Sequence, residues 1–212
     1  MVNNFFKRAV LGLALCLFLS PLVVVAGTAE VPTQDQLESR IAVSGKSPKI
    51  IVNQEKFAEQ LFTTATIELG YTLDPVNNLY VFFDPMCSNC QSIKTQLINQ
   101  SKLYSEHKVN VQIIPVCATK EGRIKAVHLY VDDPDYLEAS VLDIQTFVNL
   151  NTELYRTSFE NIGTPLVVWQ TEKGFEVLKG FPSQSTNNAF LETVARKKGV
   201  ANWMMELSGV KG

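Results

Sequence analysis

Two cysteines separated by two residues are the part of this chain best suited to chemistry. They are Cys87 and Cys90, and Ser88 and Asn89 lie between them. At the start of a helix, cysteines with this spacing can close a disulfide, with the first sulfur at the helix cap and the second one turn further in. The positive end of the helix dipole and the unpaired N–H groups there favour a thiolate, the nucleophilic form of cysteine. The pattern predicts that Cys87 attacks a disulfide and Cys90 resolves the mixed disulfide.

Other interpretations of the cysteine pair have to be weighed. A CxxC is also half of a zinc site, but no second pair exists, and Cys117, His107 and His128 show no ligand spacing. An inert structural disulfide is a further possibility, although so short a loop constrains the unfolded chain little. We favour the redox interpretation, with no metal and no organic cofactor. Cys117 ends a predicted buried strand, so we interpret it as a small apolar residue.

A strand and a helix must position the two cysteines. Residues 79–83 are a continuous apolar run with aromatic and β-branched side chains, which is typical of a strand buried on both faces. The apolar periodicity after the cysteines indicates a helix that continues to about Tyr104. Residues 109–116, rich in valine and isoleucine, are the next predicted strand. The cysteines therefore lie in a strand–helix–strand unit.

The rest of the chain predicts a mixed α/β fold. Apolar residues spaced by four indicate a helix over residues 54–69 before the first active-site strand. Residues 118–160 lack strand signals and are predicted to form a helical insert. Two strands at 166–169 and 175–178 then form a plausible hairpin, and a last helix is expected over 185–196. The order is a βαβ unit, a helical insertion and a ββα unit.

The N-terminus is typical of an export signal. A positively charged start, an apolar run and small residues before Ala26 predict a cleavable signal peptide over residues 1–26. We expect an N-terminal extension over 27–53 and the catalytic domain over 54–212. A retained membrane anchor is the alternative. The chain has Lys+Arg 19 and Asp+Glu 21, a net charge of −2 and no basic stripe, which argues against a nucleic-acid partner.

A second motif is formed by Gly163, Thr164 and Pro165, which lead into a predicted strand. A proline that opens a strand cannot donate to the ladder, so its simplest role is to mark the strand start. It also stands where a thioredoxin fold keeps a cis-proline beside its CxxC. A cis bond would turn the Thr164 backbone outward, ready to pair with an extended substrate strand. The sequence leaves the isomer open.

Residues 80–90 resemble the active-site segment of periplasmic disulfide isomerases of the DsbC/DsbG type. Residues 163–168 resemble the cis-proline loop of that family, in which a threonine precedes the proline, and the likeness covers about residues 79–199. The resemblance implies a thioredoxin-like fold with a helical insertion between its two units. It also implies catalysis by the CxxC cysteines, with Thr164 and Pro165 as the substrate-binding platform.

Three features depart from that family. The two residues between the cysteines are Ser88 and Asn89, whereas that family usually has a dipeptide that ends in an aromatic residue. This dipeptide helps to set the stability of the thiolate and hence the redox potential. The stretch before the first active-site strand is short for a dimerisation domain and linker helix, so we favour a monomer. Val81 stands where thioredoxins keep a buried carboxylate. Asp84, three residues before Cys87, could tune the thiol or bind substrate, but we favour a helix cap.

These observations together predict a periplasmic thiol–disulfide oxidoreductase acting on protein disulfides. The threonine before the proline favours an isomerase or reductase, whereas the short N-terminal region weighs against an isomerase. We expect protein substrates with cysteines or disulfides and a membrane redox partner that resets the active site. A disulfide oxidase, and a redox-inactive thioredoxin-fold binding or chaperone module, are the alternatives.

Overall fold

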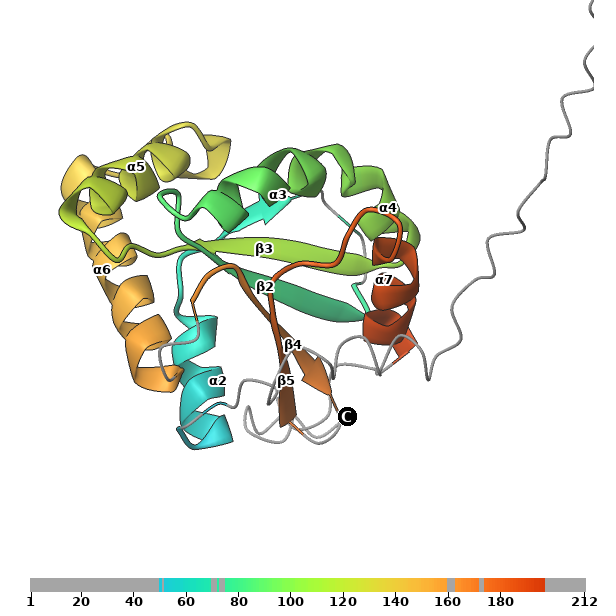
Figure 1. Ribbon diagram of the computed structural model, residues 1–212. Helices are drawn as coiled ribbons and strands as arrows, with labels where there is room; N and C mark the ends of the chain where they lie inside the picture. The colour runs from blue at the N-terminus through green and yellow to red at the C-terminus, as the bar shows by residue number, and fades with distance from the viewer. Residues whose placement is uncertain are drawn as a thin grey trace, which may run out of the picture.

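A single five-stranded sheet organises the part of the chain that the computed structural model describes, which is residues 50, 52–69, 72, 75–159, 163–171 and 174–196 (Figure 1). The strands are β1 (Ile67–Leu69), β2 (Asn77–Phe83), β3 (Val109–Pro115), β4 (Leu166–Thr171) and β5 (Gly174–Lys179). They lie in the order β1-β3-β2-β4-β5. The central strands β2 and β3 are parallel, and β1, β4 and β5 run antiparallel to the strands beside them.

Helices cover both faces of this sheet. In chain order they are α2 (Gln54–Phe62), α3 (Ser88–Asn99), α4 (Ser101–Glu106), α5 (Lys120–Val131), the 3₁₀ turn η1 (Pro134–Tyr136), α6 (Val141–Ser158) and α7 (Asn187–Arg196). Helices α3, α4 and α7 pack on one face, and α2 and α6 pack on the other (Figure 1). Helices α5 and α6, with η1 between them, form the connection from β3 to β4.

The two-sided cover explains the apolar run in β2. Leu79, Val81 and Phe83 belong to the core under α3, α4 and α7, whereas Tyr80 and Phe82 belong to the core under α2 and α6. Successive side chains of a strand point to opposite faces, so a strand covered on both faces is apolar throughout. All five residues are buried.

Two tyrosines, Tyr130 buried and Tyr136 half-buried, fasten the helical insert to the segment before β1. The Tyr130 hydroxyl donates to the carbonyl of Ala65 at 2.6 Å, and the Tyr136 hydroxyl donates to the carbonyl of Thr66 at 2.7 Å. The Asn151 side-chain amide donates both to the Tyr130 hydroxyl at 2.7 Å and to the Ala65 carbonyl at 3.0 Å. The insert is therefore fixed to the sheet edge by polar contacts as well as by its own apolar core.

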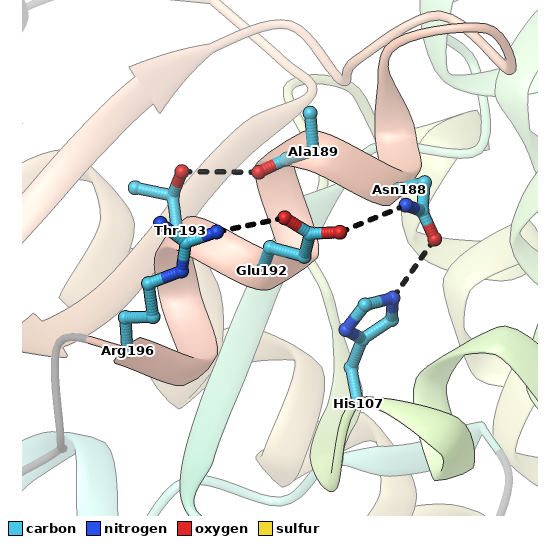
Figure 2. A network of polar contacts seen from close by, with 6 residues as sticks. All are labelled: His107, Asn188, Ala189, Glu192, Thr193 and Arg196. Atoms are coloured by element: carbon cyan, nitrogen blue, oxygen red, sulfur yellow. Dashed lines mark hydrogen bonds and ion pairs between the residues drawn. The ribbon is translucent and has the colours of Figure 1, made fainter. Parts of the chain in front are cut away.

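A polar network on the surface joins α7 to the turn after α4 (Figure 2). The ring Nε2 of His107 lies 2.9 Å from Oδ1 of Asn188. The Asn188 amide donates to Glu192 at 3.2 Å, and Arg196 donates to the same carboxylate at 2.9 Å. These groups are exposed, so the network contributes little stability and mainly orients α7 over the end of α4.

The predicted α/β class is confirmed, with a βαβ unit, a helical insertion and a ββα unit in that order. The helix predicted over 54–69 is wrong in its second half, because α2 ends at Phe62 and residues 67–69 form β1. The side chains of Thr63 and Thr64 hydrogen-bond to the carbonyl of Gln60, which caps the last turn. The helix predicted to reach Tyr104 is broken at Gln100 into α3 and α4.

The predicted signal peptide lies outside the described residues, as does the extension up to residue 49. Within the described ranges, the helices lack the combined length and apolar character that a membrane span requires.

Replacing Tyr130 with Phe should lower the free energy of unfolding by about 1–2 kcal/mol, because the Asn151 amide loses a buried acceptor. Urea denaturation of the two proteins measures this difference. Thr157→Ala is the matched control, since it removes an exposed hydroxyl that bonds within α6 and should change stability by less than about 0.5 kcal/mol. Equal effects of both substitutions would show that the Tyr130 contact does not fasten the insert.

Candidate redox site

The cysteine pair lies where the chain leaves β2 and enters α3. Cys87 is the N-cap residue of α3, with φ −75° and ψ 123°, and its side chain is partly exposed. Cys90 lies in the first turn of the helix and has an exposed fraction of 0%. Both are free thiols in this structure. The outer sulfur is therefore open to a partner, while the inner sulfur is reached only through it.

The loop before β4 faces this pair. The Thr164–Pro165 peptide bond is cis, and Gly163 before it has φ +81°. The Cys87 thiol donates to the backbone carbonyl of Thr164 at 3.1 Å. Pro165 is buried, and its carbonyl accepts from the N–H of Gly180 at 2.8 Å. The structure thus brings together Cys87, Cys90, Thr164 and Pro165, which the sequence had marked in two distant motifs.

Two placements decide the type of fold. The CxxC opens the helix after the central strand β2, and a cis-proline opens the antiparallel strand β4 beside it. The fold is thioredoxin-like. Its assignment follows from the strand order, the connections and the place of these two motifs.

Comparisons with known proteins find structural likeness at low identity. No family model and no curated protein matches the chain. Proteus mirabilis ScsC in a compact conformation is 19% identical, with 83% of this chain and 88% of that chain covered and a TM-score of 0.47. The catalytic domain of the same ScsC is 19% identical, with 69% and 98% covered and a TM-score of 0.44. A periplasmic thioredoxin-like protein from Salmonella enterica serovar Typhimurium is also 19% identical, with 71% and 98% covered and a TM-score of 0.43.

The environment of Cys87 favours its thiolate. Partial burial by itself raises the pKa of the Cys87 thiol, because it disfavours the charged form. Hydrogen bonds from the Thr164 side chain, from the backbone N–H of Cys90 and from the Cys90 thiol act in the opposite direction, as does the backbone N–H of Asn89. The hydrogen bonds outweigh burial, so the pKa lies below that of an ordinary cysteine.

Cys90 has the opposite electrostatics. The pKa of Cys90 is raised to about 12, chiefly by burial, and the adjacent Cys87 sulfur contributes in the same direction. The Thr164 side chain and the backbone N–H of Asp84 lower it without reversing the shift. Cys87 is therefore ready to act as a nucleophile, while Cys90 stays protonated until Cys87 has formed a mixed disulfide.

Asp84 is buried beside the site, with 6% of its surface exposed, and it does not cap α3. The predicted helix cap is wrong because the chain first makes a turn, in which the N–H of Cys87 donates to the Asp84 carbonyl at 3.0 Å. The carboxylate accepts from the N–H of Met86 at 2.8 Å and from the N–H of Ala118 at 3.0 Å. Asp84 therefore joins the turn before α3 to the loop after β3.

The two residues between the cysteines point outward. The side chains of Ser88 and Asn89 are exposed on the first turn of α3. Asn89 reaches the site through its backbone, whose N–H lies close enough to Cys87 to lower its pKa. Any effect of these two side chains on the thiols thus acts through solvent and an approaching partner rather than through packing.

The remaining predicted candidates lie apart from this chemistry. Cys117 is buried, and its N–H donates to the Thr152 hydroxyl at 3.1 Å, in keeping with a packing role. His107 ends α4 and takes part in the surface network, and His128 is exposed on α5. Among the described residues, three or more His, Cys, Asp or Glu side chains nowhere gather in a way that could hold a metal ion.

Sequence reasoning missed two residues of the insert that border the site. A Cβ on Gly122 of α5 would lie 3.3 Å from the Met86 side chain and 3.4 Å from an Asp84 carboxylate oxygen, so this position is tight for any larger residue. Tyr155 of α6 packs on Phe82 of β2, with ring centroids 5.6 Å apart. A glycine within the predicted helical insert was the only local signal for the first. No pattern distinguished Tyr155 from the other aromatic residues of the insert.

Replacing Thr164 with Val should raise the pKa of Cys87, because it removes a hydroxyl that stabilises the thiolate. Less thiolate is then present on the acid side of the titration. The rate of Cys87 alkylation there should fall by a factor of several up to about tenfold, the worth of one hydrogen bond to a charged group. Measuring that rate against pH tests this, and Thr164→Ser, which keeps the hydroxyl, should behave like the wild type. Identical pH profiles for Val and Ser would contradict the assigned role.

Proposed function

We propose that this protein is a thiol–disulfide oxidoreductase that acts on protein disulfides through Cys87 and Cys90. The observation that carries the proposal is the inequality of the two thiols. Cys87 is partly exposed and its pKa is lowered, whereas Cys90 is buried and its pKa is raised to about 12. A structural disulfide does not require its two cysteines to differ in exposure and pKa. A redox pair does, because one thiol must be an accessible nucleophile and the other must resolve the mixed disulfide.

In the proposed reaction, the Cys87 thiolate attacks one sulfur of a substrate disulfide and the other substrate sulfur leaves as a thiolate. Cys90 then loses its proton and attacks the Cys87 sulfur, which breaks the mixed disulfide and releases the second substrate thiol. The substrate gains two electrons, and the Cys87–Cys90 pair becomes a disulfide. In isomerisation, a substrate thiolate attacks the mixed disulfide instead and returns Cys87 as a thiolate with no net redox change.

Thr164 and Pro165 are the proposed substrate-binding residues. The Thr164 carbonyl, which accepts from the Cys87 thiol in this structure, lies beside the sulfur that a substrate must reach. A substrate strand that pairs with this backbone would place its own sulfur next to Cys87. Ser88, Asn89 and Asp84 are proposed to tune the site, the first two from the surface and Asp84 from beneath.

We further propose that the protein works in the periplasm after removal of residues 1–26, with an uncleaved anchor in the inner membrane as the alternative. A membrane redox partner would reset the cysteine pair after each cycle, and the protein would act as a monomer. No metal or organic cofactor enters the proposed reaction, because thiol exchange supplies both the nucleophile and the leaving group.

The favoured direction is isomerisation or reduction, with disulfide donation as the second candidate. The threonine before the proline supports the first. The lowered pKa of Cys87 supports the second, because a stabilised thiolate stabilises the reduced pair and makes its disulfide a stronger oxidant. A binding or chaperone module without turnover is a third candidate, which the intact cysteine pair weighs against.

Replacing Cys90 with Ala should trap substrates as mixed disulfides on Cys87, because the resolving thiol is gone. Non-reducing electrophoresis of Cys90→Ala from the periplasm of the producing cells should show bands that disappear on reduction. Cys87→Ala should show none, and Cys117→Ala should still turn over with its pair intact. If Cys90→Ala captures nothing through Cys87, the proposed catalysis is wrong.

The reduction potential of the pair should separate a reductase from an isomerase or an oxidase. Equilibration in glutathione buffers is expected to give about −200 mV or a less negative value, as for an isomerase or oxidase. A value near the −270 mV of thioredoxin, roughly, would indicate a reductase. A pair that resists reduction to well below about −300 mV would be structural, and the proposed function would fail.

A further inference from the structure

The end of the helical insert carries large apolar side chains that solvent reaches. Helix α5 ends at Val131 and α6 begins at Val141, so the connection between them forms this end (Figure 1). We call residues 131–143 the insert tip. Between 43% and 76% of the surface is exposed for four of its apolar residues, which are Val131, Leu137, Val141 and Leu142. Large apolar side chains gathered on a surface typically mark a place where another molecule binds.

Hydrogen bonds fold the insert tip into successive tight turns. The N–H of Asp133 donates to the carbonyl of Tyr130 at 3.0 Å, the N–H of Tyr136 donates to that of Asp133 at 3.1 Å, and the N–H of Ala139 donates to that of Tyr136 at 3.0 Å. Beneath these turns the rings of Tyr130, Tyr136 and Phe147 pack edge to face, with centroids 4.8 to 6.4 Å apart. The exposed apolar side chains are therefore held close together on a fixed backbone, which lowers the entropy cost of binding.

The insert tip is also strongly acidic. It contains no lysine, arginine or histidine but five acidic residues, which are Asp132, Asp133, Asp135, Glu138 and Asp143. Asp133 caps η1 and Asp143 completes the capping box of α6, but both keep their charge at the surface. The lysine nearest to the tip in the sequence, Lys125 of α5, pairs with Glu121 at 3.7 Å instead. The apolar side chains therefore lie in a negative field.

This combination of apolar and acidic side chains selects among the possible occupants. A second copy of the chain would place the same surface against itself, as two-fold contacts do, and would bring two sets of carboxylates together. A bilayer with anionic lipids would repel these carboxylates. A protein surface whose apolar side chains are flanked by lysine or arginine matches the tip in both respects.

We propose that the insert tip is a docking surface for a protein segment with apolar side chains flanked by lysine or arginine, such as one face of a basic amphipathic helix. This inference goes beyond the proposed redox function and stands without it. Gly122 near the start of α5 lies against the side chains of Met86 and Asp84, whereas Val131 ends the same helix about 14 Å further on. A segment bound to the tip therefore leaves Cys87 open.

Titration of a fluorescently labelled amphipathic helical peptide of leucine and lysine with the full-length protein tests the apolar part of the surface. Leu137→Ser combined with Leu142→Ser should raise the Kd about tenfold or more, because two exposed side chains lose their apolar contacts. Ile98→Ser combined with Leu150→Ser is the matched control, since it removes two exposed apolar side chains from α3 and from the middle of α6, and should change the Kd by less than about twofold. Equal weakening by the two pairs would overturn the inference, as would failure of the wild-type protein to bind.

The acidic part of the surface is tested with the same peptide. Asp132→Asn combined with Glu138→Gln should raise the Kd roughly three- to tenfold at low salt and make binding less sensitive to salt. Glu59→Gln combined with Glu153→Gln removes two exposed carboxylates away from the tip and should leave the Kd unchanged. A peptide of leucine and glutamate should not bind, and equally tight binding of this peptide would contradict the inference.

Two further measurements separate the insert tip from other sites and other occupants. Protein alkylated at Cys87 should bind the leucine–lysine peptide with unchanged affinity, and loss of binding would place the peptide at the redox site instead. Sedimentation velocity and flotation with phosphatidylglycerol vesicles test for a second copy and for a membrane. A dimer or a vesicle complex that Leu137→Ser with Leu142→Ser abolishes would overturn the inference.

Discussion

The antiparallel pairing of β2 with β4 is the constraint on which the site depends. In this pairing Phe82 is opposite Leu166, so the end of β2 adjoins the beginning of β4. The chain leaves β2 toward Cys87 and enters β4 from Thr164, and these two residues therefore meet although they are far apart in the sequence. A shift of this register by one residue would exchange the two buried faces of the strand, so burial on both sides holds it in place.

The helical insert follows from the same pairing. Because β4 runs against β2 and β3, the chain that leaves β3 has to begin β4 at the same end of the sheet, and the insert spans that connection. Its helices have their own small core, and Tyr130, Tyr136 and Asn151 fix them to the segment before β1. Since α5 approaches Asp84 and Tyr155 of α6 packs on Phe82 of β2, the insert forms part of the support beneath the redox site.

Much of this fold could be predicted because its strongest signals are local. The apolar run of β2 reflects burial on both faces. The CxxC and Gly-Thr-Pro motifs lie at the boundaries of helices and strands, where few residue types fit the backbone. The strand β1 was missed because it is short and lies at the sheet edge, where pairing with β3 rather than its own pattern decides its structure. The contacts of Asp84 and Tyr155 depend on elements distant in the sequence, so no local pattern could reveal them.

The two cysteines differ in pKa for reasons that belong to different parts of the fold. Cys90 is buried because α3 packs on the sheet, and burial alone makes its thiolate costly. Cys87 escapes that cost because the α3 terminus and the Thr164 loop supply hydrogen bonds to its sulfur. Those bonds are lost when the sulfur becomes part of a disulfide, so the reduced pair is stabilised relative to the oxidised pair. The position of one loop thus affects both how fast Cys87 reacts and how strongly its disulfide oxidises a partner. This loop leads directly into β4, whose first residue, Leu166, pairs with Phe82 of β2.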